Sequence, residues 1–216
     1  MLSVIRDITR RKRAEEELQK SLTQTRNAMV GTIQAMSVAS EVRDPYTAGH
    51  QRRVGQIALG IASIMSLSEE QITGLLMAAT VHDIGKIGIP AEILSKPGKI
   101  NEMEFNIIKT HVKTGYDILK NIEFPWPIAD IVLQHHERMD GSGYPNGLSG
   151  EKILLESKIL AVADVVEAMA SHRPYRAALG IDKALEEIVD KKGILYDADV
   201  VNACLKLFEQ GSFKLE

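Results

Sequence analysis

The sequence predicts an all-α protein in which one long N-terminal helix precedes a bundle of shorter helices. Beyond Asp44-Pro45, apolar residues recur at spacings of three and four, and Gly, Pro and Asn separate these segments. No segment alternates apolar and polar residues with period two, as a half-buried strand would. The helices of the bundle are expected near residues 50–66, 68–82, 101–121, 126–137, 151–171, 181–191 and 197–209.

The first forty residues contain no Pro, have Gly only at position 31 and are rich in helix formers. Pairs four residues apart, such as Arg11 and Glu15, support an exposed helix face, so a solvated face of ion pairs is favoured over nucleic-acid binding. A heptad-like seam predicts a homodimer paired through this helix, although two threonines weaken it. The seam consists of Leu18, Leu22, Thr25, Met29, Thr32 and Met36.

Local signals mark the start of two helices in the bundle. Ser68 stands before two glutamates, and Asn101 stands before Glu102. Side chains of this kind accept hydrogen bonds from the free N–H groups of a first helical turn, and acidic residues there favour the helix dipole. Both residues are therefore predicted to be N-caps.

Length and composition limit the class of protein. A chain of 216 residues can bury one sizeable core, so one globular domain with an appendage is expected. The net charge of −3 predicts no surface for a nucleic-acid polymer. The single cysteine, Cys204, excludes an intrachain disulfide, favours a reducing compartment and is expected to be a buried hydrophobic residue. No apolar run approaches the roughly 18 residues of a membrane helix, so we expect a cytoplasmic protein without a membrane segment.

Asp164 is a carboxylate on a strongly apolar stretch, "KILAVADVVEAMA". A buried carboxylate is costly unless it is paired or coordinates a metal, so Asp164 calls for a cation. The adjacent His135 and His136 diverge by about 100° in a helix, which lets a metal near a helix end contact both rings. The dipeptide His82-Asp83 is too short to be specific by itself.

Five histidines plus two aspartates exceed the number of ligands that one ion usually takes. This suggests two metals bridged by Asp83. Imidazole and carboxylate ligands suit Fe or Mn, which we expect first, and also Zn, Co or Ni. Two such ions polarise a phosphoryl group and generate hydroxide for in-line attack, so hydrolysis of a phosphate ester is the expected reaction. If the helix persists through "HDIGK", Lys86 lies on the face of His82 and can contact a phosphate. Arg173 and Arg176 offer two guanidinium groups for phosphates.

These motifs resemble the HD-GYP group of the HD phosphohydrolase superfamily over roughly residues 31–212. The resemblance rests on "HDIGK" (82–86) and "HHERMDGSGYP" (135–145), with "DPYTAGHQRRV" (44–54), "HVKTGYDIL" (111–119) and "ILAVADVVEAMASHRPYR" (159–176) in the same order. It implies an all-α, HD-type helical bundle and a phosphodiesterase that opens cyclic di-GMP to pGpG, in some members continuing to GMP.

The resemblance also implies a role for individual residues. Asp83 would bridge the metals, and Asp83 and Lys86 would serve the catalytic step. Phosphate contacts would come from Lys86, Arg173 and Arg176, while Tyr144 would shape the substrate pocket between close-packed glycines at 141, 143 and 147. His172 matches no ligand position. The metal ligands would be His50, His82, Asp83, His111, His135, His136 and Asp164.

Two departures from the family pattern matter. Tyr46 stands where members with a third metal have Glu, so two ions are predicted. Glu167 stands where the family usually has Asp, which lengthens the arm of a carboxylate next to the site. A cyclic dinucleotide-binding module without activity, and a phosphodiesterase for another dinucleotide such as 3′,3′-cyclic GMP-AMP, remain alternatives.

The segment "VIRDITRRKRAEEEL" (4–18) resembles the closing strand and exit linker of a PAS sensor domain. The chain would then be the output part of a longer sensor protein. Residues 1–30 would form the PAS end and a linker helix, 31–212 the phosphohydrolase domain and 213–216 a tail.

Overall fold

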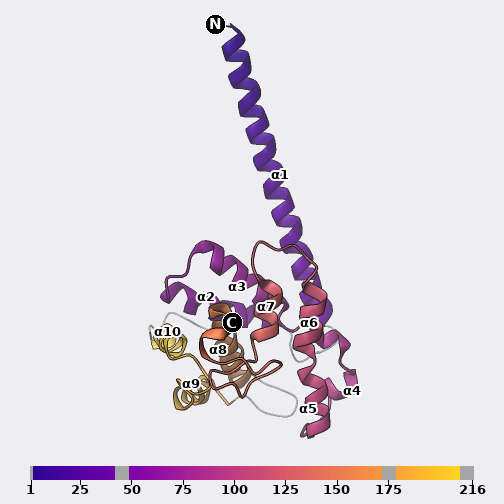
Figure 1. Ribbon diagram of the computed structural model, residues 1–216, viewed down its shortest axis with the longest axis vertical. Helices are drawn as coiled ribbons and strands as arrows, with labels where there is room; N and C mark the ends of the chain where they lie inside the picture. Colours follow the sequence, from indigo (N-terminus) through magenta and orange to yellow (C-terminus); the bar gives the residue numbers. More distant parts are fainter. Residues whose placement is uncertain (1, 42–48, 172–178, 210–216) are drawn as a thin grey trace.

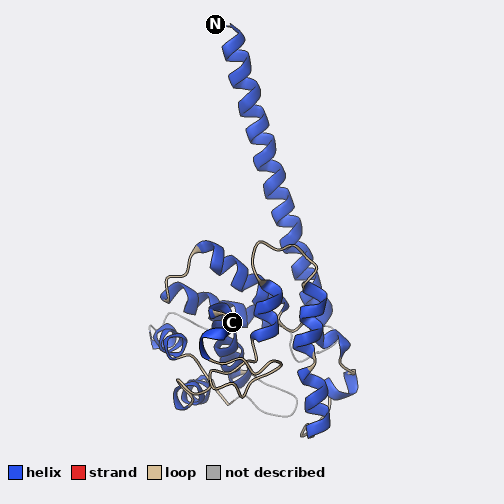
Figure 2. Ribbon diagram, in the orientation of Figure 1, coloured by secondary structure: helices blue, strands red, loops and turns tan. Residues whose placement is uncertain are grey.

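The computed structural model describes residues 2–41, 49–171 and 179–209, and these segments are helical with short connections (Figures 1 and 2). The prediction of an all-α protein is confirmed. Helix α1 (Leu2–Glu41) projects from a bundle that contains the remaining elements. The bundle comprises α2 (His50–Ile64), α3 (Glu69–Val81), η1 (Ile84–Gly88), α4 (Ala91–Leu94), α5 (Glu102–Lys109), α6 (His111–Leu119), α7 (Ile128–Gln134), η2 (Gly150–Lys152), α8 (Leu155–Ala170), α9 (Ile181–Asp190) and α10 (Ala198–Glu209).

The core lies where α2 packs against α3, α8 and α10, and α8 also packs against α9. Its largest fully buried side chains include Ile57, Leu75 and Leu160, one from each of α2, α3 and α8. Cys204 on α10 is buried in this core, as predicted, and burial raises the pKa of its thiol to about 12. Among the described helices, none has both the length and the apolarity needed to cross a bilayer.

Helix α1 divides into two halves with different surroundings. Its C-terminal half joins the core through Met29, Ile33 and Met36, and it packs on α3 and η1. Leu18 and Leu22 in the other half are 61% and 57% exposed. The predicted seam is therefore split, because this chain's own domain covers two of its members. Leu18 and Leu22, in the N-terminal half, stay exposed and can contact a second copy.

The segment that resembles the closing strand of a PAS domain is helical, since α1 already begins at Leu2. The long N-terminal helix predicted from the helix formers is observed, and the resemblance to a PAS-domain end stays a prediction. A strand needs a neighbour that pairs with its backbone, and the described residues form no sheet to which it could add. A sequence rich in helix formers then propagates the helix toward the N-terminus.

Both predicted N-caps are confirmed. The side chain of Ser68 accepts from the backbone N–H of Gln71, and that of Asn101 accepts from Glu104. In each case the third helical residue bonds back to the cap, which completes a capping box.

One predicted helix is interrupted. The segment 101–121 forms two helices, α5 and α6, which meet at Thr110. The helix expected near 68–82 ends at Val81, so it does not persist through "HDIGK", and the tighter η1 follows. Gly85 lies so close to α6 that an added Cβ would be 1.9 Å from the carbonyl oxygen of His111. This close contact requires Gly, which is a poor helix former, and explains why the helix does not continue.

Candidate metal centre

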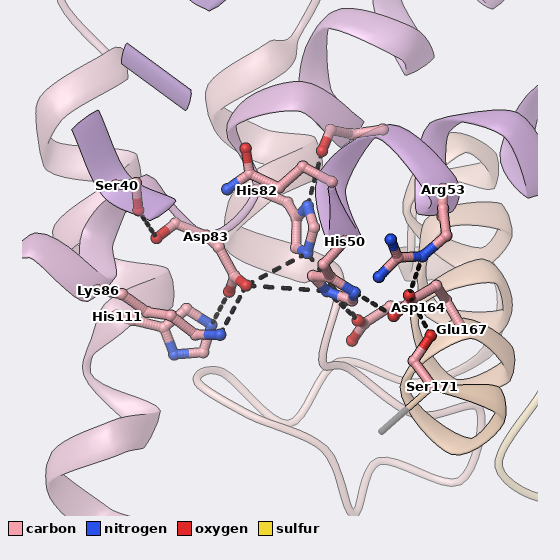
Figure 3. Close-up of polar contacts among 12 residues, drawn as sticks. Ser40, His50, Arg53, His82, Asp83, Lys86, His111, Asp164, Glu167 and Ser171 are labelled. Atoms are coloured by element: carbon pink, nitrogen blue, oxygen red, sulfur yellow. Dashed lines mark hydrogen bonds and ion pairs between the residues drawn. The ribbon is translucent and has the colours of Figure 1, made fainter. Parts of the chain in front are cut away.

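The structure brings the seven predicted ligand residues together at one site, where the ends of several helices meet. Figure 3 shows His50, His82, Asp83, His111 and Asp164 converging from different elements. His50 opens α2 and His111 opens α6, whereas His82 follows α3 and His135 follows α7. Asp164 lies within α8.

Three of these imidazoles are oriented by the backbone in the same way. Nδ1 of His82 lies 2.7 Å from the carbonyl oxygen of Ala79, and His111 and His135 make the same contact with Ile108 and Val132. Each carbonyl belongs to the last turn of a helix, where C=O groups lack partners within the helix. Because a carbonyl only accepts, Nδ1 carries the proton, and in the neutral imidazole Nε2 is then the bare nitrogen.

The bare Nε2 atoms are buried and have no hydrogen-bond partner among the described residues. Such unsatisfied buried acceptors are rare and require an explanation. A neutral imidazole with Nδ1–H bonded to a carbonyl is the usual form of a histidine metal ligand. The three side chains therefore fit divalent metal ions.

His50 is oriented differently, by a side chain. Its Nδ1 bonds to the carboxylate of Glu167, which is fully buried. Glu167 also accepts from Arg53 Nε at 2.7 Å and from the Ser171 hydroxyl at 2.7 Å (Figure 3). His50 Nε2 then points at Asp164 Oδ1, 3.1 Å away. The longer arm of Glu167 thus reaches His50 and holds it in place.

Burial opposes a charge on His50, but bonds to Asp164 and Glu167 outweigh it and raise its pKa to about 9 in the metal-free protein. Burial next to other imidazoles lowers the pKa of His135 to about 3. The two histidines therefore differ in protonation at neutral pH when no metal is bound.

Asp83 lies at the centre of the site. Its Oδ1 is 3.6 Å from Nε2 of His111, and its Oδ2 is 3.6 Å from that of His82 and 3.9 Å from that of His50. Burial would raise the pKa of Asp83, but the charge of Lys86 and the surrounding histidines holds it well below the usual range. Each oxygen of this ionised carboxylate faces a different set of imidazoles.

The potential ligand atoms form three compact groups, each within 4.8 Å. One group contains His50, His82 and Asp164, and another contains His111, His135 and His136. The third joins Asp83 to His82 and His135, one from each of the other groups. The arrangement can hold more than one ion.

Lys86 remains at the site although its helix does not persist. Its Nζ donates to Asp83 Oδ2 at 2.7 Å, and the side chain lines the cavity above the centre. The segment η1 is a 3₁₀ helix with three residues per turn, so residues 83 and 86 lie on the same face.

The loop that carries Tyr144 folds back against the histidine pair. Gly143 packs so tightly that an added Cβ would be 2.5 Å from the carbonyl oxygen of His136. The buried Glu137 accepts from the backbone N–H groups of Asn146 and Leu148 at 2.8 and 2.9 Å. Sequence reasoning did not identify Glu137. Its position directly after two histidines and before a glycine-rich loop was the available signal.

A cavity of about 340 Å³ opens over the centre. His50, Asp83, Lys86, His111, His136 and Asp164 contribute its polar lining, and Tyr144 closes one side. Burial raises the pKa of Tyr144 above its usual value, so its hydroxyl stays protonated and can donate a hydrogen bond. Val165, Ala168 and Met169 add apolar side chains to the lining.

Four residues named from the sequence lie outside the described ranges. They are Tyr46, His172, Arg173 and Arg176.

Comparison with known proteins gives consistent matches. Residues 34–200 match the model of the HD domain family. The chain is 42% identical over 194 residues to the cyclic di-GMP phosphodiesterase response regulator RpfG of Xanthomonas campestris, covering 89% of this chain and 51% of that protein. It is 42% identical over 195 residues to a cyclic di-GMP phosphodiesterase of Thermotoga maritima, covering 89% and 53%. A Vibrio cholerae 3′3′-cGAMP-specific phosphodiesterase is 39% identical over 71% of this chain and 33% of that protein.

The chain thus spans about half the length of the first two of these relatives. Among solved structures, the cyclic GMP-AMP specific phosphodiesterase V-cGAP3 of V. cholerae matches with a TM-score of 0.61 at 20% identity, over 82% of this chain and 48% of that one. The HD domain of the L. monocytogenes phosphodiesterase PgpH, in complex with cyclic-di-AMP, matches with a TM-score of 0.60 at 20% identity, over 82% and 97%. These structural matches establish the shared fold.

Proposed function

The chain belongs to the HD domain family, and we propose that it is a metal-dependent phosphodiesterase of the HD-GYP group that hydrolyses cyclic di-GMP. The observation that carries the proposal is the set of three buried, unsatisfied Nε2 atoms around Asp83. Two relatives named as cyclic di-GMP phosphodiesterases support this substrate.

Two divalent ions fit the ligand groups best. His50, His82 and Asp164 would hold one, His111, His135 and His136 would hold the other, and Asp83 would bridge them with its two oxygens. The ligand chemistry suits Fe or Mn first, and also Zn, Co or Ni. Tyr46, in the place of a further carboxylate, supports two ions over three. Such a pair of ions supplies polarisation of the phosphoryl group and a water of lowered pKa.

The protein's own groups would bind and orient the phosphodiester. Lys86 places its ammonium at the cavity wall, where it can donate to a phosphoryl oxygen. Arg173 and Arg176 are proposed as further phosphate contacts. In the reaction the oxygen of water bonds to phosphorus while the P–O3′ bond breaks, which leaves the 5′-phosphate of pGpG. Some members of the group continue to GMP.

The direct test is incubation of metal-loaded protein with cyclic di-GMP, followed by chromatography of the products. The proposal expects pGpG or GMP, together with two transition-metal equivalents per chain by elemental analysis. No product over several hours with bound metal present contradicts it. Histidines that merely pack in the core would instead leave the protein without metal.

Hydrolysis of 3′,3′-cyclic GMP-AMP is a second candidate, favoured by the 39% identity to a V. cholerae enzyme with that name. Turnover of both dinucleotides side by side, compared as kcat/KM, separates the two substrates. A binding module without activity is the remaining alternative. It requires tight binding of cyclic di-GMP without cleavage when Fe or Mn is supplied anaerobically.

We propose residues 31–212 as the phosphohydrolase domain, 1–30 as a sensor-derived end and linker helix, and 213–216 as a tail. The protein would be a cytoplasmic homodimer attached to an upstream sensor. Leu18 and Leu22, in the exposed half of α1, would form the dimer contact. Replacing both leucines with Glu is expected to give monomers in analytical ultracentrifugation, whereas an unchanged mass contradicts this interface.

A further inference from the structure

A second cavity, of about 290 Å³, is lined in part by Tyr144. Its lining comes from the end of α5, the start of α6 and the loop: Asn106, Lys109, Thr110, Lys113, Tyr144 and Pro145. Tyr144 also lines the cavity over the metal centre. The two cavities therefore adjoin at this side chain, and one ligand can reach both.

Lys109 is a half-buried cation beside this outer cavity. Its Nζ lies 5.2 Å from the centre of the Phe105 ring and 5.9 Å from that of Tyr144. No carboxylate is within ion-pair distance of Lys109 in the segments that the structure describes. Lys120, just past the far end of α6, also lies over a tyrosine, at 5.7 Å, but its Nζ is 2.5 Å from Asp117. Lys109 thus keeps a charge that can bind an anion.

Phe105 presents an aromatic surface next to this charge. The side chain is 47% exposed on α5 and meets the Tyr144 ring edge-on, with centroids 6.4 Å apart. The Tyr144 ring also lies 4.8 Å from that of His136, between ring centroids. A row of rings therefore leads from the metal centre to the outer cavity. An aromatic face beside a free cation is the combination that binds a base and its phosphate.

We propose that the outer cavity holds the half of the cyclic dinucleotide that is not being hydrolysed, with Lys109 on its phosphate and Phe105 stacked on its base. A cyclic dinucleotide carries two phosphodiester groups on opposite sides of one ring. When one of them lies at the metal centre, the other must occupy neighbouring space. The inference rests on the proposed function and adds to it a second subsite with a stated ligand chemistry.

The test compares Lys109→Met with wild type on two substrates, cyclic di-GMP and bis(p-nitrophenyl) phosphate. Methionine keeps a long apolar side chain against the rings but removes the charge. The KM for cyclic di-GMP is expected to rise about tenfold or more, because a charge-assisted bond to phosphate is lost. Hydrolysis of bis(p-nitrophenyl) phosphate, which needs only the metal side, should stay within twofold. Lys120→Met is the control with the same charge change, and Lys109→Arg should restore KM.

Phe105→Ala tests the stacking contact, with Ile107→Ala on the same helix as a control of similar exposure. Loss of one stacked base is expected to raise KM for cyclic di-GMP by about tenfold. A KM within twofold of wild type in both Lys109→Met and Phe105→Ala overturns the subsite.

The failure of the proposed function has a different signature. Wild type would then hydrolyse bis(p-nitrophenyl) phosphate but leave cyclic di-GMP intact. Equilibrium dialysis with labelled cyclic di-GMP decides the subsite in that case. Weaker binding by Lys109→Met supports the subsite, and equal or absent binding by wild type and variant rejects it.

Discussion

His50 and the three histidines His82, His111 and His135 face the same centre but are held by different means. The three lie at helix ends or junctions, where their Nδ1–H groups reach carbonyls of a last helical turn. His50 is the first residue of α2, where the free backbone groups are N–H donors. A donor cannot accept the imidazole proton, so His50 needs a side-chain acceptor, and Glu167 provides it.

The two kinds of acceptor differ in whether a mutation can remove them. The acceptor of His50 is a replaceable side chain that depends on Arg53 and Ser171. The acceptors of the other three are backbone atoms, so only a shift of the helix end can disturb them. The two kinds of anchor should therefore respond differently to mutation.

His135→Ala removes an imidazole of the backbone-held kind that belongs to two of the three ligand groups. Metal affinity is expected to fall by more than the roughly 100-fold that loss of an outer hydrogen-bond partner costs. Elemental analysis after dialysis measures it, with activity as the second readout. A variant that retains the metal content of wild type would show that His135 is only a core residue.

Gly85→Ala attacks a backbone anchor without touching a ligand. An added Cβ at Gly85 would be 1.9 Å from the carbonyl oxygen of His111, so η1 and α6 must move apart. The free energy of unfolding is expected to fall by about 1–3 kcal/mol, with weaker metal binding. Gly88→Ala is the matched control, because its nearest neighbour would be 3.5 Å away. Urea denaturation of both variants checks this, and equal midpoints contradict it.

Glu167→Gln weakens the side-chain anchor of His50 by removing its charge. Metal affinity is expected to fall about 10- to 100-fold, as for other outer-shell partners of histidine ligands. Glu156→Gln, on the same helix and remote from His50, should bind metal as wild type does. Competition with a chromogenic chelator measures both. Glu167→Asp tests whether the length of the side chain matters. A metal affinity equal to that of wild type would show that it does not.

In the metal-free protein, the side-chain anchor of His50 should make the free energy of unfolding depend on pH. Because the pKa of His50 is raised to about 9, its proton contributes stability that is fully present below pH 6.5. That contribution is lost as pH rises through 9. Glu167→Gln should reduce this contribution. The free energies of unfolding of wild type and variant should therefore differ more at pH 6 than at pH 9.5. Denaturation of chelator-treated protein at both values checks this, and a constant difference contradicts it.

Local signals allowed the sequence to predict part of the fold. Ser68 and Asn101 act on N–H groups within three residues, so both caps follow from the sequence without any tertiary contact. The break at Thr110 was missed. It lies next to His111, whose carbonyl oxygen packs against Gly85, and this is a contact between distant parts of the chain.

The candidate site divides in the same way. The resemblance to the HD-GYP group implied the seven ligand candidates, which the structure brings together. Pattern alone could not identify Glu137 as the residue that holds the Tyr144 loop or Glu167 as the anchor of His50. Each is an ordinary acidic residue in sequence, and its role comes from burial beside backbone N–H groups or an imidazole.

The helical class, the helix starts and the residue types that suit a metal centre follow from the sequence, because these depend on periodicity and local chemistry. Packing of the helices sets which half of α1 is buried and which acceptor orients each histidine. It also makes Tyr144 a lining residue of two cavities. These features depend on side chains far apart in sequence that meet after the helices pack, and no local pattern records such contacts.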